Sequence, residues 1–283
     1  MTIDRTTTAS TGLALGPGVH ARAARVRWTR SLSYFFLQYR RTWVSSLASN
    51  FVYPTLYLTA MGVGLGHLIN AHVGTHAATL GGISYLSFLA PGVLASSAMQ
   101  VGVQESTYPV LGAIRWTYAY VAMVATPLRV IDVLRGQLAF IVFRLVVTCA
   151  TFALIATAFG ALRSAEAVLS VPAAVLCGLA FAAPIAAFAA KQDYDGGFPV
   201  LNRLIVIPLF LFSGTFFPVH QLPLVLQWVA LATPLYHGVA LSRAFAEGHG
   251  FVWSSLGHVA YLLCMITIGY VWATKTFERR LAK

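Results

Sequence analysis

The chain has 283 residues, of which 58% are hydrophobic and only 10% are charged, against about 25% charged residues in soluble chains. Its mean hydropathy is +0.74. This composition excludes an ordinary soluble enzyme, a disulfide-rich secreted scaffold and a disordered polar protein. It predicts an all-α integral membrane protein. The net charge of +11 raises nucleic-acid binding as a first explanation, to be weighed against the placement of basic loops.

The N-terminal region changes character near residue 20. Residues 1–20 are rich in Thr, Gly and Ala and have no apolar core, which predicts a disordered cytoplasmic lead without a cleaved signal. Residues 21–43 carry an apolar stripe at helical spacing, with Arg27 and Arg30 on the opposite side. The stripe consists of Trp28, Leu32, Phe35, Tyr39 and Trp43. We expect an interfacial amphipathic helix over residues 21–43; the alternative is a cytoplasmic extension of the first span.

Six apolar windows are long enough to cross the ~30 Å hydrocarbon core of a bilayer as helices. They cover residues 44–66, 83–103, 136–159, 168–190, 198–217 and 252–274. Six spans form one membrane domain over residues 44–275, followed by a cytoplasmic C-terminus over residues 276–283, and they place both termini on one side. Sixteen of the 19 Lys and Arg residues then lie on that side, which makes it cytoplasmic. The basic excess is therefore topological, and no nucleic-acid partner is expected.

Residues 106–135 separate the second and third spans on the inner side and are too apolar for a flexible loop. Within them, the stretch from Ala113 to Val124 mixes aromatic and basic side chains and predicts one short amphipathic helix. Thr126 and Pro127 fit an N-cap and a first helical position, so the helix of the third span should begin there. A protruding helix of this kind can transmit force; the alternative is that it rests on the membrane surface.

Glu105 and Arg144 are the two conspicuous ionisable residues predicted near lipid depth, where charge is costly. One hypothesis is that they form an ion pair. The alternatives are that Arg144 snorkels toward the headgroups and that Glu105 is simply solvated. Acidic residues number only eight in the whole chain and do not form the chain of carboxylates that a proton-driven pump would use.

The outer region after the fifth span, residues 218–246, is apolar but interrupted, so that no single straight helix can form. Its prolines are Pro218, Pro223 and Pro234. We expect two short helices, Leu222 to Ala232 and Leu235 to Ala246, that dip in from the outer face because each is about half the length of a span. The non-helical backbone at Ser213 and Gly214 must be shielded or line a wet cavity. Such a pair commonly marks a permeation path; packing on the outer surface is the alternative.

Motifs for catalysis and cofactor binding are absent from the sequence. It contains no Gly-x-x-x-x-Gly-Lys-Ser/Thr phosphate loop, no His-Glu-x-x-His and no Gly-x-Ser-x-Gly. Cys149, Cys177 and Cys264 lie in separate spans and predict neither disulfides nor a metal site. Seven of the eight histidines fall on the outer side, which suggests metal binding or pH sensing, but their spacing matches no metal motif. We expect no catalytic residue, cofactor or metal in this chain.

Three stretches of the sequence follow a recognisable pattern. They are Phe210 to Val219 with Leu222-Pro223 and Thr233 to Gly238, Ala125 to Gly136, and Phe88 to Leu94. In order and spacing they resemble the type 2 export permeases of ATP-binding-cassette transporters, most closely the nodulation-protein-J-like and antibiotic-exporter branch. Together with the N-terminal helix and the six spans, the resemblance covers nearly everything from Arg22 onward.

The resemblance implies that this chain works with other subunits. In that family two permeases combine with two nucleotide-binding ATPase subunits, so a second permease copy or close relative, two ATPases and the membrane lipids are the expected partners. ATP and Mg²⁺ would bind in the ATPase. The N-terminal helix and a cytoplasmic coupling helix within residues 106–135 would contact it. The residues implied in this contact are Arg27, Arg30, Arg115, Trp116, Tyr118 and Tyr120.

The resemblance also implies a route between the two permeases, lined by the first, second and fifth spans. An apolar and aromatic lining suits a lipid, a lipid-linked glycan or a hydrophobic drug better than an ion, although each residue could serve ordinary packing instead. The candidates for the lining are Phe51, Tyr53, Tyr57, Phe88, Phe210 and Phe212. The outer re-entrant gate would comprise Ser213, Gly214, Phe216, Phe217, Pro218 and Pro234.

The expected function is export of an amphiphile across a bacterial plasma membrane by alternating access, in which ATP closes the partner subunits and the coupling helix moves rigidly. Three alternatives make different predictions. A membrane scaffold or assembly protein would tolerate substitution of Arg115 and Trp116, an ion-driven secondary carrier would need no nucleotide, and an enzyme would turn over a lipid. Residues 191–195 of an inner loop depart from the family's pattern, which leaves their role open.

Overall fold

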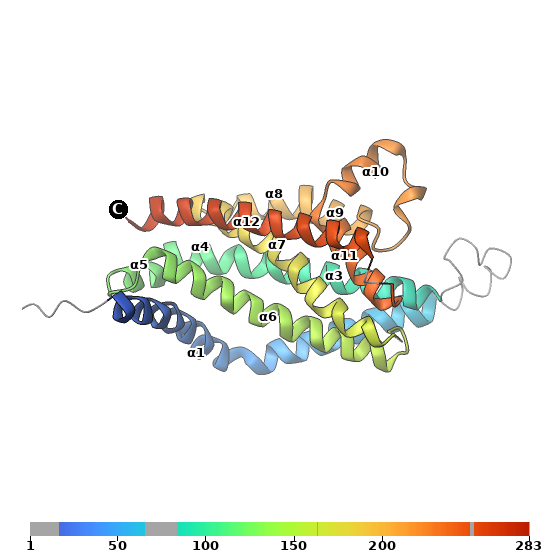
Figure 1. Ribbon diagram of the computed structural model, residues 1–283, viewed down its shortest axis with the longest axis horizontal. Helices are drawn as coiled ribbons and strands as arrows, with labels where there is room; N and C mark the ends of the chain where they lie inside the picture. Colours follow the sequence, from blue (N-terminus) through green and yellow to red (C-terminus); the bar gives the residue numbers. More distant parts are fainter. Residues whose placement is uncertain (1–16, 66–83, 163, 250–251, 283) are drawn as a thin grey trace, which may run out of the picture.

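The long helices run side by side in an elongated bundle (Figure 1). The computed structural model describes residues 17–65, 84–162, 164–249 and 252–282, and in this part of the chain every regular element is helical. The long helices are α1 (Pro17–Tyr57), α3 (Tyr85–Ser106), α6 (Val130–Ala158), α7 (Ser170–Lys191) and α12 (Trp253–Leu281). The predicted all-α class is therefore confirmed for the described residues.

Four of the six predicted spans coincide with helices that are long and apolar enough to cross a membrane. These helices are Tyr85–Arg115, Val130–Ala158, Ala165–Lys191 and Trp253–Leu281. The predicted first span falls on the end of α1 and a π-helical segment, Leu58–Leu65, and the fifth falls on the short apolar helix Gly197–Phe212. A helix of about 16 residues is only about 24 Å long. Within the described residues the structure thus supports four crossings, or five if a bent pair forms one span.

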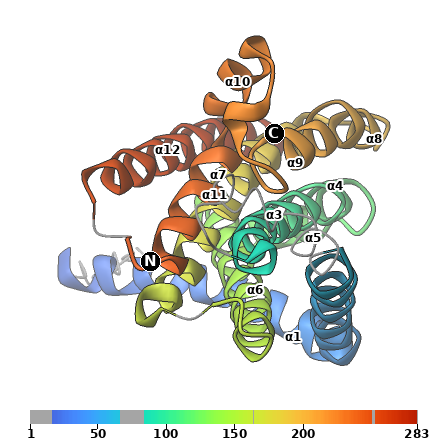
Figure 2. The same ribbon diagram turned by 90° about the vertical axis from the view of Figure 1, so that its right-hand side faces the viewer.

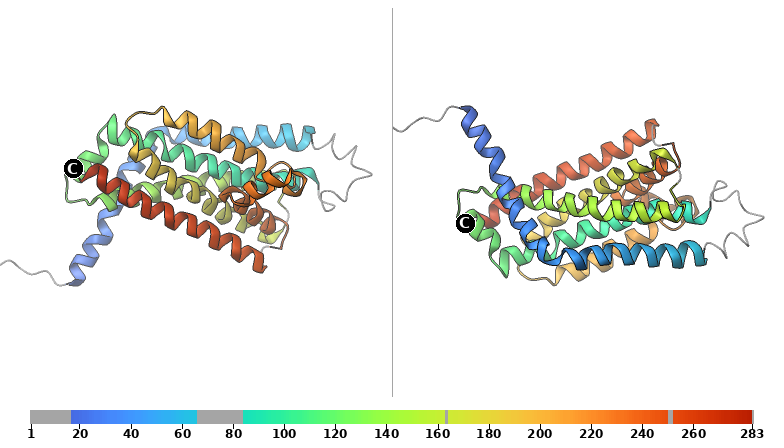
Figure 3. Two further views of the ribbon diagram at one scale, coloured as in Figure 1. Left: turned by 90° about the horizontal axis from the view of Figure 1, so that it is seen from above. Right: turned by 90° about the horizontal axis from the view of Figure 1, so that it is seen from below.

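Helix α1 is continuous over 41 residues, so no helix end separates the predicted interfacial helix from the first span. The reason is local, since neither Gly nor Pro occurs between Gly18 and Pro54. The first part of α1 leaves the bundle at an angle, and the second part runs along it (Figure 3). The helix begins at Pro17, inside the predicted disordered lead, and residues 1–16 of that lead lie outside the described residues.

Helix α7 lies at the centre of the bundle and packs against α3, α6, α11 (Pro234–Ala246) and α12. Its many buried alanines let neighbouring helices approach closely. A Cβ added at Gly102 of α3 would clash with the carbonyl of Gly178 on α7, and one added at Gly238 of α11 would clash with Cys177. Small residues at these crossings therefore fix the spacing of the central helices.

The two ends of the bundle are built differently. Helix α1 begins and α12 ends beside the short helices α4 (Tyr108–Arg115) and α5 (Ala119–Val124), and we call this end the α5 end (Figure 1). At the opposite end, the α10 end, α10 (Leu224–Leu231) and α11 meet at a bend of 80°. Figure 2 shows α10 projecting from the rest of the bundle. The prediction of two short helices in this region is confirmed.

The start of α6 differs from its prediction. Thr126 and Pro127 precede the helix, which begins at Val130 with Arg129 as its N-cap residue. The carboxylate of Asp132 accepts a hydrogen bond from the backbone N–H of Arg129 over 3.1 Å. This bond satisfies a donor at the helix start, as acidic residues three positions after a cap commonly do. The hydroxyl of Thr126 instead donates to the carbonyl three residues before it.

Candidate functional site

The segment predicted to couple the chain to an ATPase lies at the α5 end and is not one helix. Helix α4 ends at Arg115 before α5 begins, which corrects the predicted single helix from Ala113 to Val124. The backbone N–H groups of Trp116 and of the next residue both donate to the carbonyl of Gly112 and close the helix. Tyr118 then adopts the left-handed conformation, with φ 52°. This conformation is strained for a residue with a bulky side chain and marks a defined turn.

Arg115 is held by an ion pair with Asp193, which lies in the loop after α7. Arg280, near the end of α12, donates to the same carboxylate oxygen over 2.5 Å and to the carbonyl of Gln192 over 3.3 Å. The hydrogen bonds from Arg280 and Arg115 hold the pKa of Asp193 below its ordinary value. Residues 191–195, whose role the sequence left open, therefore join α4, α7 and α12.

The other predicted coupling residues occupy two kinds of position. Trp116 and Tyr118 stand on the surface of the α5 end, with 57% and 58% of their area exposed. Arg27 and Arg30 lie on the first part of α1, which reaches the same end of the bundle, and Arg30 is exposed. The exposed aromatic pair on a strained turn is the most prominent surface feature of this segment.

Tyr120 belongs to the core and is not on the predicted contact surface. Its side chain is buried, and its hydroxyl donates to Oε1 of Gln137 over 2.9 Å. The ring lies between Phe35 of α1 and Phe277 of α12, with centroids 6.3 Å and 5.9 Å away. Burial is favourable here because the hydroxyl has a partner. Tyr120 thus anchors α5 to three long helices.

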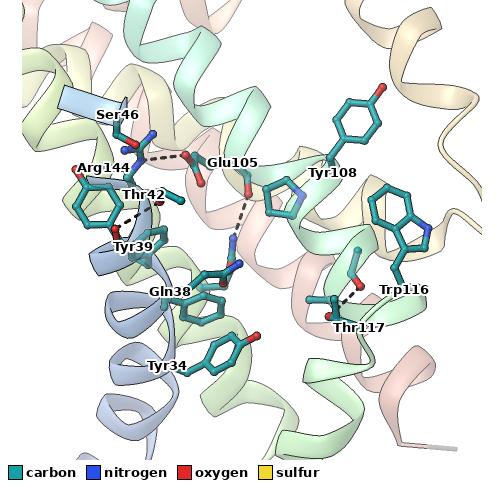
Figure 4. A pocket seen from close by; sticks show the side chains of 16 residues that line it. Tyr34, Gln38, Tyr39, Thr42, Ser46, Glu105, Tyr108, Trp116, Thr117 and Arg144 are labelled. Atoms are coloured by element: carbon teal, nitrogen blue, oxygen red, sulfur yellow. Dashed lines mark hydrogen bonds and ion pairs between the residues drawn. The ribbon is translucent and has the colours of Figure 1, made fainter. Parts of the chain in front are cut away.

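A cavity of about 430 Å³ lies between α1, the junction of α3 and α4, and α6. Polar and aromatic side chains from these elements surround it, and Arg144 and Glu105 point toward each other (Figure 4). Its lining includes Tyr39, Thr42, Glu105, Tyr108, Trp116 and Arg144. A concave site with aromatic walls and a few convergent polar groups is the usual form of a small-molecule site.

Glu105 and Arg144, for which the sequence suggested an ion pair, lie in contact within this cavity. Nε of Arg144 donates to Oε1 of Glu105 over 2.9 Å, and the two side chains are only 15% and 19% exposed. The carbonyl of Glu105 accepts from the Gln137 amide over 3.1 Å, and the Tyr39 ring lies 5.1 Å from the guanidinium. Nη1 of Arg144 is buried and has no hydrogen-bond partner among the described residues. The pair neutralises both charges but leaves Nη1 of Arg144 without an acceptor.

Arg243 of α11 organises the predicted gate at the α10 end. Its Nη2 donates to the carbonyls of Phe88 (3.3 Å) and Gly214 (3.0 Å), and its guanidinium lies 3.9 Å from the centroid of the Phe88 ring. Gly214 has φ +81°, a conformation that favours glycine. The buried hydroxyls of Ser213 and Thr233 lie 3.3 Å apart. Arg243 therefore ties the non-helical turn after α9 (Ile207–Phe212) to α3.

The remaining gate residues form the connection to α10. Phe216 packs edge-on against Phe210 with centroids 5.0 Å apart. Phe217 is partly buried, Pro218 precedes a short 3₁₀ turn, and Pro234 occupies the first turn of α11. These contacts show a folded connection at this end.

The predicted pathway residues do not line one continuous surface within the chain. Tyr53 and Tyr57 lie together on α1 with ring centroids 5.9 Å apart, and Phe51 is exposed on the same helix. Phe212 is exposed at the end of α9, whereas Phe88 is buried under the guanidinium at the α10 end. Phe88 therefore acts as a packing residue.

The described residues contain no group of three or more His, Cys, Asp or Glu that could hold a metal. The ring Nδ1 atoms of His237 and His258 lie 2.7 Å apart. His67, His72 and His76 lie outside the described residues. Free thiols in the described part are those of Cys149, Cys177 and Cys264.

Three parts of the site were not predicted: Asp193, Arg243 and the polar residues of α1 that enter the cavity. The α1 residues had a visible signal, because Gln38, Thr42 and Ser46 recur every four positions and so share a helix face. Asp193 had no such signal, since its partners lie far from it in the chain. Arg243 had no such signal either, because the carbonyls that it bonds lie 155 and 29 positions away in the chain.

Comparison with known proteins gives one consistent result. The sequence model of the family described as "ABC-2 type transporter" matches residues 28–245. Nodulation protein J of Rhizobium leguminosarum bv. trifolii is 31% identical over 259 residues, which cover 90% of this chain and 93% of that protein. Nodulation protein J of Rhizobium leguminosarum bv. viciae is 27% identical, with 92% of this chain and 97% of that protein covered. No solved structure matches the chain.

Proposed function

The chain belongs to the ABC-2 type transporter family, and from that premise we propose that it is the permease of an exporter whose ATPase is a separate chain. Membership makes it a multi-pass membrane transport subunit. In the proposed assembly, two permeases combine with two ATPase subunits in a bacterial plasma membrane, and ATP and Mg²⁺ bind to the ATPases. The proposed topology has six crossings with both termini in the cytoplasm, which is supported by α1 beginning and α12 ending at the same end.

The construction of the α5 end carries this proposal. Trp116 and Tyr118 are exposed beside Arg115, which is joined through Asp193 to the ends of α7 and α12. Tyr120 anchors the following helix in the core. A partner that presses on this turn would displace α4, and the ion pairs would carry the displacement to α7 and α12. Such a surface suits a subunit that delivers mechanical work.

An amphiphile is the proposed substrate class. The cavity beside the α5 end combines aromatic rings with a few polar groups, and the exposed flank of α1 is apolar, including Phe51 and Leu56. An amphiphile can satisfy both kinds of surface at once, whereas an ion would need a polar lining throughout. The route between two permeases, with Tyr53, Tyr57 and Phe212 among its lining, remains part of this proposal.

The proposal is tested by comparing compounds exported from living cells. Three strains are needed: wild type, a strain lacking this gene, and a strain whose partner ATPase carries a substituted phosphate-loop lysine. Organic extracts of the medium and of the cells are analysed by mass spectrometry. The same amphiphiles should vanish from the medium and accumulate in the cells of both altered strains.

The other outcomes separate the competing functions. Export that depends on this gene but not on the ATPase lysine would indicate an ion-driven carrier. Unchanged export in both strains would indicate a scaffold without transport of its own. Either result would overturn the proposal.

A further inference from the structure

Four polar side chains follow one another along a single face of α1. They are Gln38, Thr42, Ser46 and Asn50, each four residues from the next. Residues at this spacing lie one above another on a helix. Gln38, Thr42 and Ser46 line the cavity with the Glu105–Arg144 pair, so the polar face of α1 is turned toward α3 and α6 (Figure 4).

A second cavity, of about 270 Å³, continues the first one along the same helices. Its polar lining consists of Asn50, Tyr53, Ser97, Gln100, Gln104 and Thr148. On each of the three helices, a residue of the first cavity lies within one turn of a residue of the second. These neighbours are Ser46 and Asn50 on α1, Glu105 and Gln104 on α3, and Arg144 and Thr148 on α6. The two cavities therefore follow one another as a groove with polar groups along its length, about 22 Å long from Gln38 to Tyr53 at the rise of an α-helix.

The groove contains polar atoms that nothing in the described residues satisfies. Nδ2 of Asn50, Nη1 of Arg144 and the hydroxyl of Thr148 are buried without a hydrogen-bond partner. Unsatisfied polar groups are costly, above all at the depth of a bilayer. Nδ2 of Asn50 and Nη1 of Arg144 can only donate, and the Thr148 hydroxyl can donate as well. A ligand that satisfies all three must therefore offer several hydrogen-bond acceptors. Because Arg144 is already paired with Glu105, the site does not demand a net charge.

The α1 wall of the groove separates it from an exposed apolar surface. Helix α1 packs along α6, whereas its π-helical continuation, Leu58–Leu65, packs against α3. The face of α1 that points away from Asn50 is apolar and exposed, with Val52 and Leu56 at 50% and 64%. A molecule in the groove can therefore keep a polar group among the three helices while an attached apolar chain lies outside.

We infer that the groove between α1, α3 and α6 binds the acceptor-rich headgroup of an amphiphile and guides it along the span while the apolar chain stays in lipid. The inference rests on the proposed function for the claim that the amphiphile is the exported one. It assigns headgroup binding to a surface inside one permease, which meets the proposed route between two permeases at Tyr53. Arg144, Asn50 and Thr148 are the residues that bind the headgroup.

Cysteine labelling of the full chain in phosphatidylcholine nanodiscs tests the groove without any ATPase. A Cys264→Ser background removes the exposed thiol, and Cys149 and Cys177 are buried. Ser46→Cys and Asn50→Cys report on the groove, while Val52→Cys and Leu56→Cys, on the exposed apolar face of the same helix, are the matched controls outside the groove. A charged, water-soluble thiosulfonate should modify the groove cysteines at least about tenfold faster than the controls, because only a hydrated thiol ionises and reacts.

Ligand protection then tests the chemistry of the occupant. Dodecyl phosphate, below its micelle concentration, should slow labelling of Ser46→Cys, whereas dodecyltrimethylammonium, whose headgroup has no acceptor, should not. The protection should be lost in Arg144→Gln and in the nearly isosteric Thr148→Val but retained in Arg135→Gln, because Arg135 is exposed on the same helix and bonds Tyr270 instead.

Three results would overturn the inference: groove cysteines that react no faster than the controls, equal protection by both detergents, or equal protection by inorganic phosphate, which would indicate a free-anion site. None of these depends on an ATPase. A permease that lacks ATPase-driven export but shows the groove behaviour would instead count against the proposed function alone.

Discussion

Arg115 and Asp193 lie 78 positions apart in the chain and form an ion pair at the α5 end of the bundle. The pair joins the last residue of α4 to the loop that follows the central helix α7. Arg280 of α12 binds the same carboxylate, so one acidic side chain connects three helices. The connection lies directly beside exposed Trp116, where a partner subunit would act.

Replacing Asp193 with Asn should weaken coupling more than stability. Exposed ion pairs contribute little to the free energy of unfolding, so the midpoint of thermal unfolding should hardly change. ATP hydrolysis by the permease–ATPase complex should fall by at least about twofold, the lower range for residues that carry coupling between sites. Asp195→Asn, in the same exposed loop, is the control. Equal hydrolysis by both variants would show that the contact has no part in coupling.

The contact should also respond to pH in a defined window. Because the arginines lower the pKa of Asp193 in the folded chain, its contribution is complete above the ordinary aspartate value of 3.8 and is lost as pH falls below it. Hydrogen exchange of α4 should therefore be slower in wild type than in Asp193→Asn from pH 8 to about pH 5, and the difference should shrink only as pH falls below 3.8. A difference that fades already between pH 7 and about pH 5 would contradict this assignment.

Glu105→Gln should destabilise the bundle, because it leaves Arg144 without its carboxylate where both side chains are mostly buried. We expect a loss of about 3 kcal/mol in the free energy of unfolding, the lower end for breaking one side of a buried pair. Glu105→Gln combined with Arg144→Met should recover most of this loss, since removing both charges is often neutral. Thermal unfolding in detergent measures the stability of the single and of the double variant. Glu278→Gln, at an exposed position, is the control. Equal unfolding temperatures for Glu105→Gln and Glu278→Gln would refute the buried ion pair.

Two glycine substitutions should have opposite signs. Gly102→Ala places a Cβ against the backbone carbonyl of Gly178, which should force α3 and α7 apart and cost about 1–3 kcal/mol. Gly257→Ala in α12 meets nothing within 4 Å and should stabilise the helix by up to about 1 kcal/mol. Thermal unfolding of both variants checks the crossing. A Gly102→Ala variant as stable as Gly257→Ala would mean that the two helices do not approach so closely.

The helices that could be predicted from the sequence are those marked by a local pattern of apolar residues or prolines. Uninterrupted apolar runs located α3, α6, α7 and α12, and the prolines of residues 218–246 indicated two short helices. The pairing of Glu105 with Arg144 was foreseeable because few charges occur at that depth, so each had few possible partners. The family resemblance is confirmed by the match over residues 28–245.

Other features depend on contacts that no local pattern encodes. The break between α4 and α5 contains neither Gly nor Pro, and the helix after it is held by the Tyr120 ring against Phe35 and Phe277, which lie far away in the chain. The fifth predicted span proved too short as a helix because residues 213–217 leave the helical conformation. The triad of Arg115, Asp193 and Arg280 exists only because α7 and α12 pack together along their length. Such contacts follow from the assembled bundle.

Coupling through the α5 end is best measured as ATP hydrolysis by the permease–ATPase complex in lipid nanodiscs. The test protein carries Arg115→Glu with Trp116→Ala. The control carries Arg279→Glu with Trp228→Ala, which removes an exposed arginine of α12 and an exposed tryptophan at the opposite end. We expect the test protein either to form no complex with the ATPase or to show a rate of ATP hydrolysis at least about tenfold lower, as for an interface hot spot. The control should behave as wild type. Hydrolysis and complex formation that are equal in the two proteins would contradict an export permease driven through this surface.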